Sequence, residues 1–351
     1  MKKILLTGGG TAGHVTPNIA LLPSLRKAGY EIHYIGTADG IEHELIKREN
    51  ITYHQISAGK LRRYFDFKNL TDLFRIAAGF FQSLLIVARS KPDIVFSKGG
   101  FVSCPVVWAS WFFGRPVIIH ESDISPGLAN KLSIPFARKI CYSFPETSKF
   151  LPAGKGVHSG LPVRQSIFSG NKDEGRRLCG FSDDKPVVMV ICGSQGSQII
   201  NKAVLESLPI LLTRFNICHI CGKGGLTANQ PGYHQFEYVN DELPHLFALS
   251  DVVISRSGAT TLFELLALSK PALLIPLATN ASRGDQILNA RSFEKQGFSK
   301  VLNQNQLSKE TLTENIQIVY SNRQEMISLM KNSPIPDGVK AVVTLIEEIT
   351  L

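Results

Sequence analysis

The segment 255–264 (SRSGATTLFE) follows an apolar run, 251–254, that is typical of a buried strand, and it opens a segment of helical character, 261–268. A strand that turns through a glycine into a helix gathers backbone N–H groups at the positive end of the helix dipole, where a phosphate binds. Glu264 lies about one and a half turns into this helix. Its carboxylate would repel a phosphate but could accept hydrogen bonds from a neighbouring sugar. The alternative is that Glu264 is a solvated helix residue.

His14 is a second candidate for chemistry, because it ends the glycine-rich segment 8–14 (GGGTAGH). This segment follows a short apolar strand, 3–7, and precedes a helix expected to start near Pro17, a residue favoured in a first helical turn. The glycine spacing is not that of the dinucleotide fingerprint, so it indicates close approach of a ligand rather than nicotinamide binding. A lone histidine is more often structural, but this one is expected at the carboxyl edge of a sheet, where ligands bind.

Nine Lys and Arg residues stand against three acidic residues between positions 47 and 91, and this basic excess predicts an anionic partner. Within it, basic and aromatic residues precede a segment, 61–88, whose apolar residues recur at helical spacing and are expected to be mostly core. Such a mixture suits an anionic membrane surface or stacked bases, and the membrane is favoured because no nucleic-acid motif accompanies it. The candidate membrane patch comprises Arg62, Arg63, Phe65, Lys68, Phe74 and Arg75.

The elements that must position these residues alternate between strand and helix in two successive sets. This pattern, in a chain of 351 residues, predicts two doubly wound α/β domains that face each other across a cleft. The strand and turn at 93–100 look like a counterpart of 251–258, and the loop at 192–197 repeats the placement of the first glycine loop. The expected domains are 1–161 and 162–335, with a C-terminal helix at about 336–351 that packs back on the first.

Composition excludes several classes of protein. The sequence has a formal charge of +9 and no apolar run long enough to span a membrane. Its apolar start is interrupted by Gly8, too early for a signal peptide, so the protein is expected in the cytoplasm. Cys218 and Cys221 have CxxC spacing without a second pair, which favours buried thiols over a zinc or redox site.

Taken together, the motifs resemble the MurG family of glycosyltransferases. The matching segments are GGGTAGH at 8–14, SKGGFV at 97–102, HE at 120–121, GSQG at 193–196, SRSGAT at 255–260 with Glu264, and DQ at 285–286 with NA at 289–290. The resemblance implies the GT-B fold and an inverting transfer of N-acetylglucosamine from UDP-N-acetylglucosamine. The implied acceptor is the C4 hydroxyl of the muramyl sugar of lipid I, and the product is lipid II for peptidoglycan synthesis.

The resemblance also implies where the protein acts and with which partners. It implies peripheral attachment to the cytoplasmic face of the bacterial plasma membrane, and involvement in cell wall biogenesis, cell shape, cell division and the cell cycle. The expected partners are UDP-N-acetylglucosamine, lipid I, anionic inner-leaflet phospholipid and other proteins of cell-wall synthesis and division, with no nucleic acid. No tightly bound cofactor and no metal held by protein ligands are expected.

Roles for individual residues follow from the resemblance by position. The implied donor-binding residues are Thr11, Ala12, Gly13, Arg164, Ser194, Val239, Gly258, Ala259, Thr260, Thr261, Glu264 and Gln286. The acceptor diphosphate is expected at Gly9, Gly10, Gly99 and Gly100. His14 is the first candidate for the catalytic base and Asp123 the second, and Arg256 or Arg164 could add a charge-assisted bond to the leaving group.

The sequence departs from the family's usual pattern at a few positions. The substituted residues are Ala12 for glycine, Phe101 for tyrosine, Asp123 for asparagine and Asp285 for glutamine. A carboxylate in place of an amide changes the local charge and removes hydrogen-bond donors. Three other functions stay open: a UDP-N-acetylglucosamine 2-epimerase, another lipid-directed GT-B glycosyltransferase, and a non-catalytic nucleotide-sugar binding protein.

Overall fold

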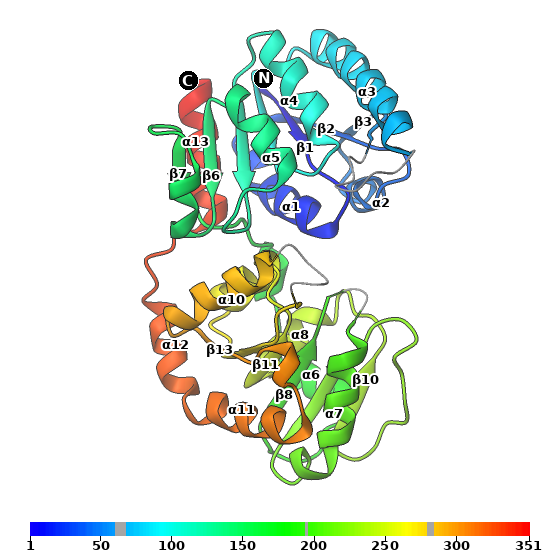
Figure 1. Ribbon diagram of the computed structural model, residues 1–351, viewed down its shortest axis with the longest axis vertical. Coiled ribbons are helices and arrows are strands. Elements are labelled where there is room, and N and C mark those ends of the chain that lie inside the picture. The colour runs from blue at the N-terminus through cyan, green and yellow to red at the C-terminus, as the bar shows by residue number, and fades with distance from the viewer. Residues whose placement is uncertain (60–67, 194–195, 279–283) are drawn as a thin grey trace. The chain divides into compact units, whose positions relative to one another are not determined.

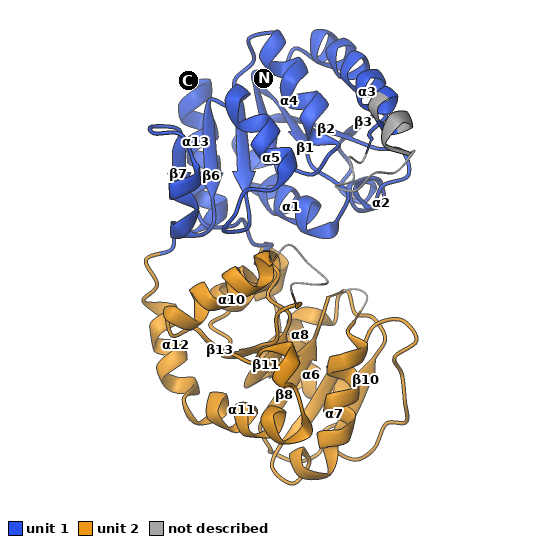
Figure 2. Cartoon of the chain, viewed as in Figure 1, with its two compact units in different colours: residues 1–164, 335–351 blue, residues 165–334 orange. Residues whose placement is uncertain are grey.

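The computed structural model describes residues 1–59, 68–193, 196–278 and 284–351, which form two compact units (Figures 1 and 2). Unit 1 comprises Met1–Arg164 and Ile335–Leu351, and unit 2 comprises Gln165–Pro334. The first unit therefore ends at 164, where the sequence suggested 161, and the chain returns to it at 335. Of the helices that the structure describes, none is both long and apolar enough to cross a lipid bilayer.

Unit 1 is built on a parallel sheet in the order β3-β2-β1-β4-β5-β6-β7. Its strands are β1 (Lys3–Thr7), β2 (Glu31–Gly36), β3 (Thr52–Gln55), β4 (Ile94–Ser97), β5 (Val117–Glu121), β6 (Lys139–Tyr142) and β7 (Gly156–His158). Its helices are α1 (Ala12–Lys27), α2 (Ile41–Lys47), α3 (Lys68–Ser90), α4 (Ser103–Phe112), α5 (Leu128–Ser133) and α13 (Gly338–Thr350).

The central residues of β1, 4–6, are all apolar because helices cover both faces of the sheet. Ile4 and Leu6 pack into a core with α1 and α13, whereas Leu5 packs on the opposite face with Val87 of α3 and Val106 of α4. The C-terminal helix thus belongs to the same hydrophobic core as the first strand.

Unit 2 repeats this architecture on a parallel sheet in the order β10-β9-β8-β11-β12-β13. Its strands are β8 (Val187–Ile191), β9 (Asn216–Ile220), β10 (Tyr233–Phe236), β11 (Val252–Ser255), β12 (Ala272–Leu274) and β13 (Ser299–Val301). Its helices are α6 (Lys172–Cys179), α7 (Gln198–Leu211), α8 (Leu243–Leu249), α9 (Ala259–Ala267), α10 (Asp285–Lys295), α11 (Lys309–Ser321) and α12 (Arg323–Lys331).

Each sheet has one point where the strand order reverses, and ligands of open α/β sheets bind at the carboxyl ends of the strands there. In unit 1 the reversal lies between β1 and β4, so it is flanked by the loop 8–10 and the turn 98–100. In unit 2 it lies between β8 and β11, flanked by residues 192–193 and 196–197 and by the turn 256–258. The glycine segments of the sequence motifs therefore lie, where the structure describes them, at the two positions that suit ligand binding.

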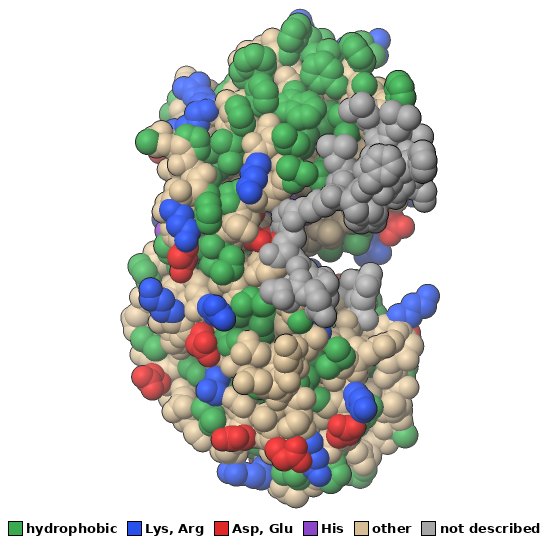
Figure 3. Space-filling model, viewed as in Figure 1, with side chains coloured by type: hydrophobic (Ala, Val, Ile, Leu, Met, Phe, Trp, Pro, Cys, Tyr) green, Lys and Arg blue, Asp and Glu red, His purple; other side chains and the backbone are tan. Residues whose placement is uncertain are grey.

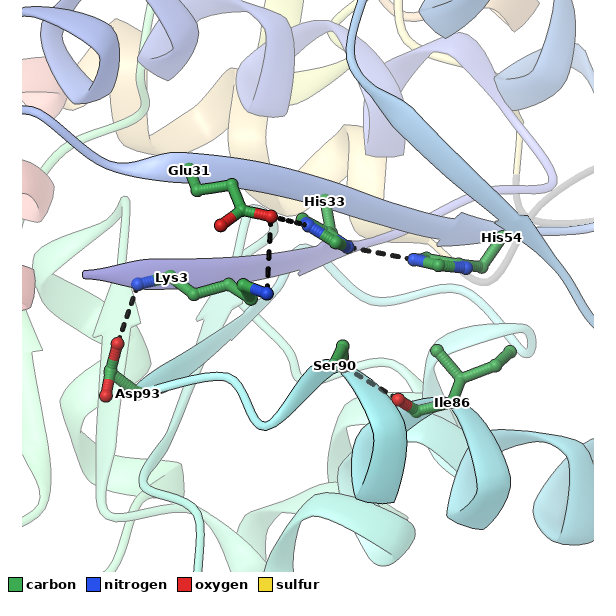
Figure 4. Close-up of polar contacts among 7 residues, drawn as sticks. All are labelled: Lys3, Glu31, His33, His54, Ile86, Ser90 and Asp93. Carbon is green, nitrogen blue, oxygen red and sulfur yellow. Dashed lines mark hydrogen bonds and ion pairs between the residues drawn. The ribbon is translucent and has the colours of Figure 1, made fainter. Parts of the chain in front are cut away.

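The expected correspondence between residues 93–100 and 251–258 is confirmed at the other end of the strands. The carboxylate of Asp93 accepts the backbone N–H of Lys3 at 2.6 Å, and that of Asp251 accepts the N–H of Val187 at 2.8 Å. In unit 1 the side chain of Lys3 also forms an ion pair, with its ammonium 3.2 Å from the carboxylate of Glu31 (Figure 4). Each aspartate thus joins the strands that flank the order reversal.

The same polar cluster reaches the edge of the sheet in unit 1. Glu31 accepts a hydrogen bond from His33 Nε2 at 2.7 Å, and His33 Nδ1 lies 2.9 Å from His54 Nε2 (Figure 4). Burial, the His33 ring and the charge of Lys3 lower the pKa of His54. This chain of contacts joins β1, β2 and β3.

One expected element differs in the structure. Helix α1 begins at Ala12 rather than near Pro17. Asn18 Nδ2 donates to the Thr7 carbonyl and the Tyr34 hydroxyl, both at 3.2 Å, and so ties the helix to β1 and β2. Strand β10 carries the polar residues His234 and Gln235, which interrupt its apolar pattern in the sequence.

Candidate active site

The turn between β11 and α9 matches its expected form. Gly258 caps the helix in an extended conformation, and the first backbone bond back to its carbonyl comes from Leu262 N–H at 3.1 Å. The N–H groups of residues 259–261 precede that bond and carry the positive end of the helix dipole. A side-chain carbon built on Gly258 would meet nothing within 4 Å, so an anion has room to approach the backbone.

Glu264 is only 7% exposed on α9, so the interpretation of it as a solvated helix residue is wrong. A buried carboxylate near a helix N-terminus requires hydrogen-bond donors, because its charge has lost most of its water. The expected role as acceptor for sugar hydroxyls is consistent with this placement.

Arg256 is anchored within unit 2 by two hydrogen bonds, and its expected contact with the leaving group stays a prediction. Its guanidinium donates to the Ile275 carbonyl at 2.9 Å and to Ser197 Oγ at 2.8 Å. Ser197 in turn caps α7 by accepting from Ile200 N–H at 3.5 Å. Arg256 therefore joins the glycine loop after β8 to the end of β12, and burial lowers its pKa.

Gln286 is oriented by backbone contacts on two sides. Its side-chain oxygen accepts Leu277 N–H at 3.1 Å, and its carbonyl accepts the Ser257 hydroxyl at 2.8 Å. Since the oxygen is used in this way, the amide NH₂ is the part of Gln286 that could donate to a donor sugar. Asp285 begins α10 and is largely buried beside it.

A buried polar network supports the glycine loop of unit 2. His219 lies between Tyr233 Oη, 3.0 Å from Nδ1, and Asn201 Oδ1, 3.1 Å from Nε2. Asn201 Nδ2 donates to the Cys221 carbonyl at 2.8 Å. That carbonyl approaches Gly196 so closely that a side-chain carbon there would lie 2.0 Å from it. The sequence pattern did not single out His219 or Asn201, because neither belongs to a motif.

His219 makes the stability of unit 2 sensitive to acid. Burial lowers its pKa to about 4, from 6.5, so the unfolded chain binds a proton more readily than the folded one. Stability is then fully present above pH 6.5 and declines as the pH falls towards 4. Between pH 7.5 and 4.5 we expect His219 to account for a loss of about 2 to 3 kcal/mol.

Hydrogen exchange of peptides from β8 and β9 at the two pH values measures this loss in wild type and in His219→Gln. The glutamine does not titrate, so its peptides should lose correspondingly less protection on acidification, after correction for intrinsic exchange rates. Peptides from unit 1 are the internal control and should behave alike in both proteins. An equal pH dependence of β9 in both proteins would rule out His219 as the group responsible.

Three further donor-binding candidates are Val239, Arg164 and Ser194. Val239 is largely buried in the loop that follows β10 in unit 2. Arg164 is the last residue of unit 1. Ser194 lies outside the described residues. The roles of these residues stay predictions.

The first glycine loop is held by a residue that the sequence motifs did not reveal. Glu42 is buried, and its carboxylate accepts N–H from Gly10 at 3.0 Å, N–H from Thr37 at 3.1 Å and the Thr37 hydroxyl at 2.6 Å. A side-chain carbon on Gly9 would lie 2.5 Å from the same carboxyl group. The glycines are thus needed for contact with Glu42 as well as for any ligand.

The second glycine turn of unit 1 lies directly against the first. Gly9 N–H points at the Gly99 carbonyl at 3.4 Å, and a side-chain carbon on Gly100 would lie 2.3 Å from the Gly9 carbonyl. Gly99 and Gly100 both have positive φ, 92° and 84°, which other residues rarely adopt. The structure therefore brings together the four glycines predicted for the acceptor diphosphate.

His14 lies in the first turn of α1, not in a loop before it. Its Nδ1 is 3.0 Å from Thr11 Oγ1, and its N–H donates to the Thr11 carbonyl at 3.1 Å. Thr11 precedes the helix in an extended conformation, and Ala12 and Gly13 open it. The imidazole is therefore oriented beside the glycine loop and is partly exposed.

Asp123 follows β5 in a loop that is fixed by Glu121. Each carboxylate oxygen of Glu121 accepts a loop N–H at 3.0 Å, from Asp123 on one side and Gly127 on the other. Asn130 also donates to Glu121 at 2.7 Å. Burial and the charge of Asp123 raise the pKa of Glu121. His120 lies just before it, wholly buried, with Nε2 2.9 Å from the Gly160 carbonyl.

The expected apolar stripe of α3 is not mostly core, which corrects the sequence interpretation. Phe74 is 70% and Phe81 69% exposed, and Leu85 is exposed on the same face. The buried face includes Gly79, Ser83 and Val87, and a side-chain carbon on Gly79 would lie 2.0 Å from the Ser57 carbonyl. We call Phe74, Phe81 and Leu85 the α3 apolar face.

Helix α4 packs beside α3 and also exposes Trp111 and Phe112 at its end. Hydrophobic side chains gather over this part of unit 1 (Figure 3). Of the candidate membrane patch, Lys68 begins α3, and Arg75 is exposed and lies 3.7 Å from Asp72. Arg62, Arg63 and Phe65 lie outside the described residues.

The six cysteines are buried free thiols, and Cys218 lies within β9. Burial raises the pKa of Cys221, and the contact with Cys179 together with burial raises that of Cys218, so neither is an activated thiolate. The described residues contain no group of three or more His, Cys, Asp or Glu side chains that could hold a metal ion.

Comparison with known proteins assigns both halves of the chain to the same glycosyltransferase family. Residues 4–142 match the glycosyltransferase family 28 N-terminal domain, and residues 187–345 match the glycosyltransferase family 28 C-terminal domain. A protein of Clostridium tetani is 55% identical over 350 residues, which cover 99% of this chain and 98% of that protein. A protein of Clostridium kluyveri is 53% identical over 351 residues, 99% of each chain. Both are named UDP-N-acetylglucosamine–N-acetylmuramyl-(pentapeptide) pyrophosphoryl-undecaprenol N-acetylglucosamine transferase.

Solved structures agree with this assignment. The crystal structure of MurG from Acinetobacter baumannii matches with a TM-score of 0.77 and 25% identity, covering 99% of this chain and 100% of that one. A UDP-GlcNAc 2-epimerase from Neisseria meningitidis, bound to UDP-GlcNAc, matches with a TM-score of 0.70 at 13% identity, over 99% of each chain. At that identity the second likeness shows the GT-B fold alone.

Proposed function

Since this chain belongs to the MurG family within glycosyltransferase family 28, we propose that it transfers N-acetylglucosamine from UDP-N-acetylglucosamine to the C4 hydroxyl of the muramyl sugar of lipid I. The product is lipid II. The observation that carries the proposal is 55% identity over nearly the whole of both chains to a transferase named for this reaction. The fold is GT-B, and the two sheet reversals provide one binding position in each unit.

The donor is bound by unit 2 in this proposal. The N–H groups at 259–261 and the dipole of α9 hold the diphosphate, Glu264 accepts the ribose hydroxyls, and Gln286 donates to the sugar. When the bond between the sugar and UDP breaks, its electron pair goes to the diphosphate oxygen. The same N–H groups stabilise this developing charge, which is where catalytic stabilisation is most effective.

The acceptor hydroxyl attacks the anomeric carbon from the opposite side, so the configuration inverts. A new bond forms between the acceptor oxygen and that carbon, and the hydroxyl proton passes to a base. His14 is the first candidate because its imidazole is oriented by Thr11 beside the glycine loop, and Asp123 is the second. No tightly bound cofactor enters the proposal, because UDP-N-acetylglucosamine is consumed as a substrate.

The acceptor's diphosphate lies in unit 1 in this proposal, at Gly9, Gly10, Gly99 and Gly100. Positive φ at three of these glycines turns the backbone so that the two loops meet at the carboxyl ends of β1 and β4. A backbone without side chains lets a diphosphate approach closely.

The other proposed partners are proteins of cell-wall synthesis and division.

A peripheral position on the cytoplasmic face of the plasma membrane would give the protein access to its lipid acceptor. It is supported by the α3 apolar face, by the exposed aromatic end of α4 and by the basic residues of segment 47–91. Aromatic side chains insert at the level of lipid headgroups, and basic ones are attracted to anionic lipid.

Replacing Arg62, Arg63 and Lys68 together by alanine should release the protein from vesicles that contain anionic phospholipid. Each basic residue near such a surface contributes about 1 kcal/mol, so partitioning should weaken roughly a hundredfold. Cosedimentation with vesicles measures the effect. A matched control replaces Lys172, Lys202 and Lys331, exposed lysines of unit 2, and should bind as wild type does. Equal binding by both triple variants would remove the basic patch from the proposal.

Release of UDP from UDP-N-acetylglucosamine, with and without a lipid I analogue, tests the function itself. Release that depends on the analogue, with the disaccharide product detected by mass spectrometry, is expected. Epimerised sugar without an acceptor would indicate an epimerase. Tight donor binding without release, with any acceptor, would indicate a non-catalytic binding protein.

A further inference from the structure

Lys98 is a buried cation that the reaction as described does not use. It is 1% exposed, and its backbone N–H donates to the Thr7 carbonyl at 2.8 Å. Its side chain passes below the first glycine loop, where a side-chain carbon on Gly8 would lie 3.1 Å from Lys98 Cβ. The ammonium donates to the hydroxyl of Ser122 in the loop after β5. One side chain thus joins the loops that follow β1, β4 and β5.

The charges around Lys98 come mainly from the loop that carries Asp123. Glu121 and Asp123 attract the ammonium, and so does the Cys141 thiol on β6 when it is ionised, whereas burial opposes its charge. The net result lowers the pKa of Lys98 to about 8, so it is still mostly protonated at neutral pH. His120, also buried there, has its pKa lowered by burial and by the Lys98 charge, and is neutral.

Glu121 exerts the larger of the two attractions on Lys98, but it is also held by hydrogen bonds of its own. Its two oxygens accept three N–H groups, from Asp123, Gly127 and Asn130. Asp123 is the second carboxylate within reach of the Lys98 charge, and it stands in the partly exposed part of the same loop. A buried ammonium is costly to desolvate, so a residue needed only to fill this space would not need a charge.

We propose that Lys98 is a positioning residue for the transfer reaction, whose ammonium holds Ser122 and so keeps the neighbouring carboxylate of Asp123 in place for the acceptor sugar. The inference rests on the role proposed for Asp123. An opposite charge nearby favours the ionised form of a carboxylate. An amide at position 123 would need no such compensation, so the lysine and the aspartate act as one unit.

A double-mutant cycle tests the coupling, with kcat/KM for a lipid I analogue measured in the full chain. Lys98→Met keeps the length of the side chain and removes its charge. Alone, it should lower kcat/KM about tenfold, as should Asp123→Asn, because each removes one member of a coupled pair. In the Asp123→Asn background, Lys98→Met should cost less than about threefold. Additive losses, or wild-type kcat/KM in either single variant, would overturn the inference.

Lys98→Arg gives a second readout that does not depend on how much activity survives. In wild type, kcat/KM should fall as the pH rises through about 8, where Lys98 loses its proton. The pKa of Cys141 is raised to about 12 and that of His120 is lowered, so neither titrates there. A guanidinium stays protonated, so the fall should move to higher pH in Lys98→Arg. A fall at the same pH in both proteins would contradict the inference.

Failure of the proposed function and failure of the role of Lys98 give different results. If the proposed function is wrong, wild type shows no acceptor-dependent UDP release. If only the role of Lys98 is wrong, wild type turns over and the variants lack the coupling and the pH shift. Affinity for UDP, which unit 2 binds, should stay within about twofold of wild type in the folded variants, and thermal unfolding identifies a variant that does not fold.

Discussion

His14→Ala is expected to lower kcat for transfer to a lipid I analogue by roughly two to four orders of magnitude. The acceptor hydroxyl would then lose the group that takes its proton, while the diphosphate sites of both units remain. The wild-type imidazole is oriented for this task by the contact of Nδ1 with Thr11 Oγ1 at 3.0 Å. Steady-state UDP release at saturating donor and acceptor measures kcat directly, and the affinity for UDP should change little.

Asp123→Asn is the matched comparison, because it removes a carboxylate from the same unit and keeps the shape of the side chain. Its expected loss is about tenfold, as for a residue that holds the acceptor rather than taking its proton. Thr11→Val is a further control, since it retains the imidazole and removes the hydroxyl that orients it. A collapse in Asp123→Asn, with His14→Ala within tenfold of wild type, would assign proton transfer to Asp123 instead.

Glu264→Ala should weaken the binding of UDP by about 3 kcal/mol, or roughly a hundredfold. A hydrogen bond to a charged group is worth about 1.5 to 3 kcal/mol, and Glu264 is expected to accept two from the ribose. The side chain is 7% exposed, so water does not readily replace it. Isothermal titration of UDP against wild type and variant gives the two dissociation constants.

A ligand comparison separates this role from a structural one. UDP with a 2′-deoxyribose lacks one of the two hydroxyls, so Glu264→Ala should lose clearly less affinity for it than for UDP. If Glu264 served only to hold α9, both ligands would lose affinity equally. Glu206→Ala is the protein control, since that glutamate is exposed on α7 in the same unit and should bind UDP as wild type does.

The sequence predicted the parts of the site that depend on neighbouring residues in the chain. An apolar run, a glycine turn and a helix of period 3.6 are local patterns, and they indicated both sheets and the start of α9. The glycine motifs that follow β1, β4, β8 and β11 lie at the two strand-order reversals, since β1 and β8 each begin a doubly wound unit. Burial of Glu264 removed the one alternative that the local pattern had left open.

Partners far apart in the sequence were decided by the tertiary structure alone. Glu42 lies 32 positions from Gly10, whose N–H it accepts, and no spacing rule connects them. Arg256 is joined to Ile275 and to Ser197, 59 positions away, by hydrogen bonds that its place in the sequence motif did not indicate.

Helix α3 shows that local sequence patterns also do not determine how a helix packs. Its apolar period was clear in the sequence, yet Phe74 and Phe81 face outward because small residues such as Gly79 bring the other face against the loop that follows β3. Periodicity identifies an apolar face but not what covers it. By itself, the sequence determined the alternation of strands and helices and the reaction family, and it predicted a set of residues for the substrate sites. The tertiary structure decided which charges are buried and which apolar side chains stay exposed, because both depend on contacts between distant segments of the chain.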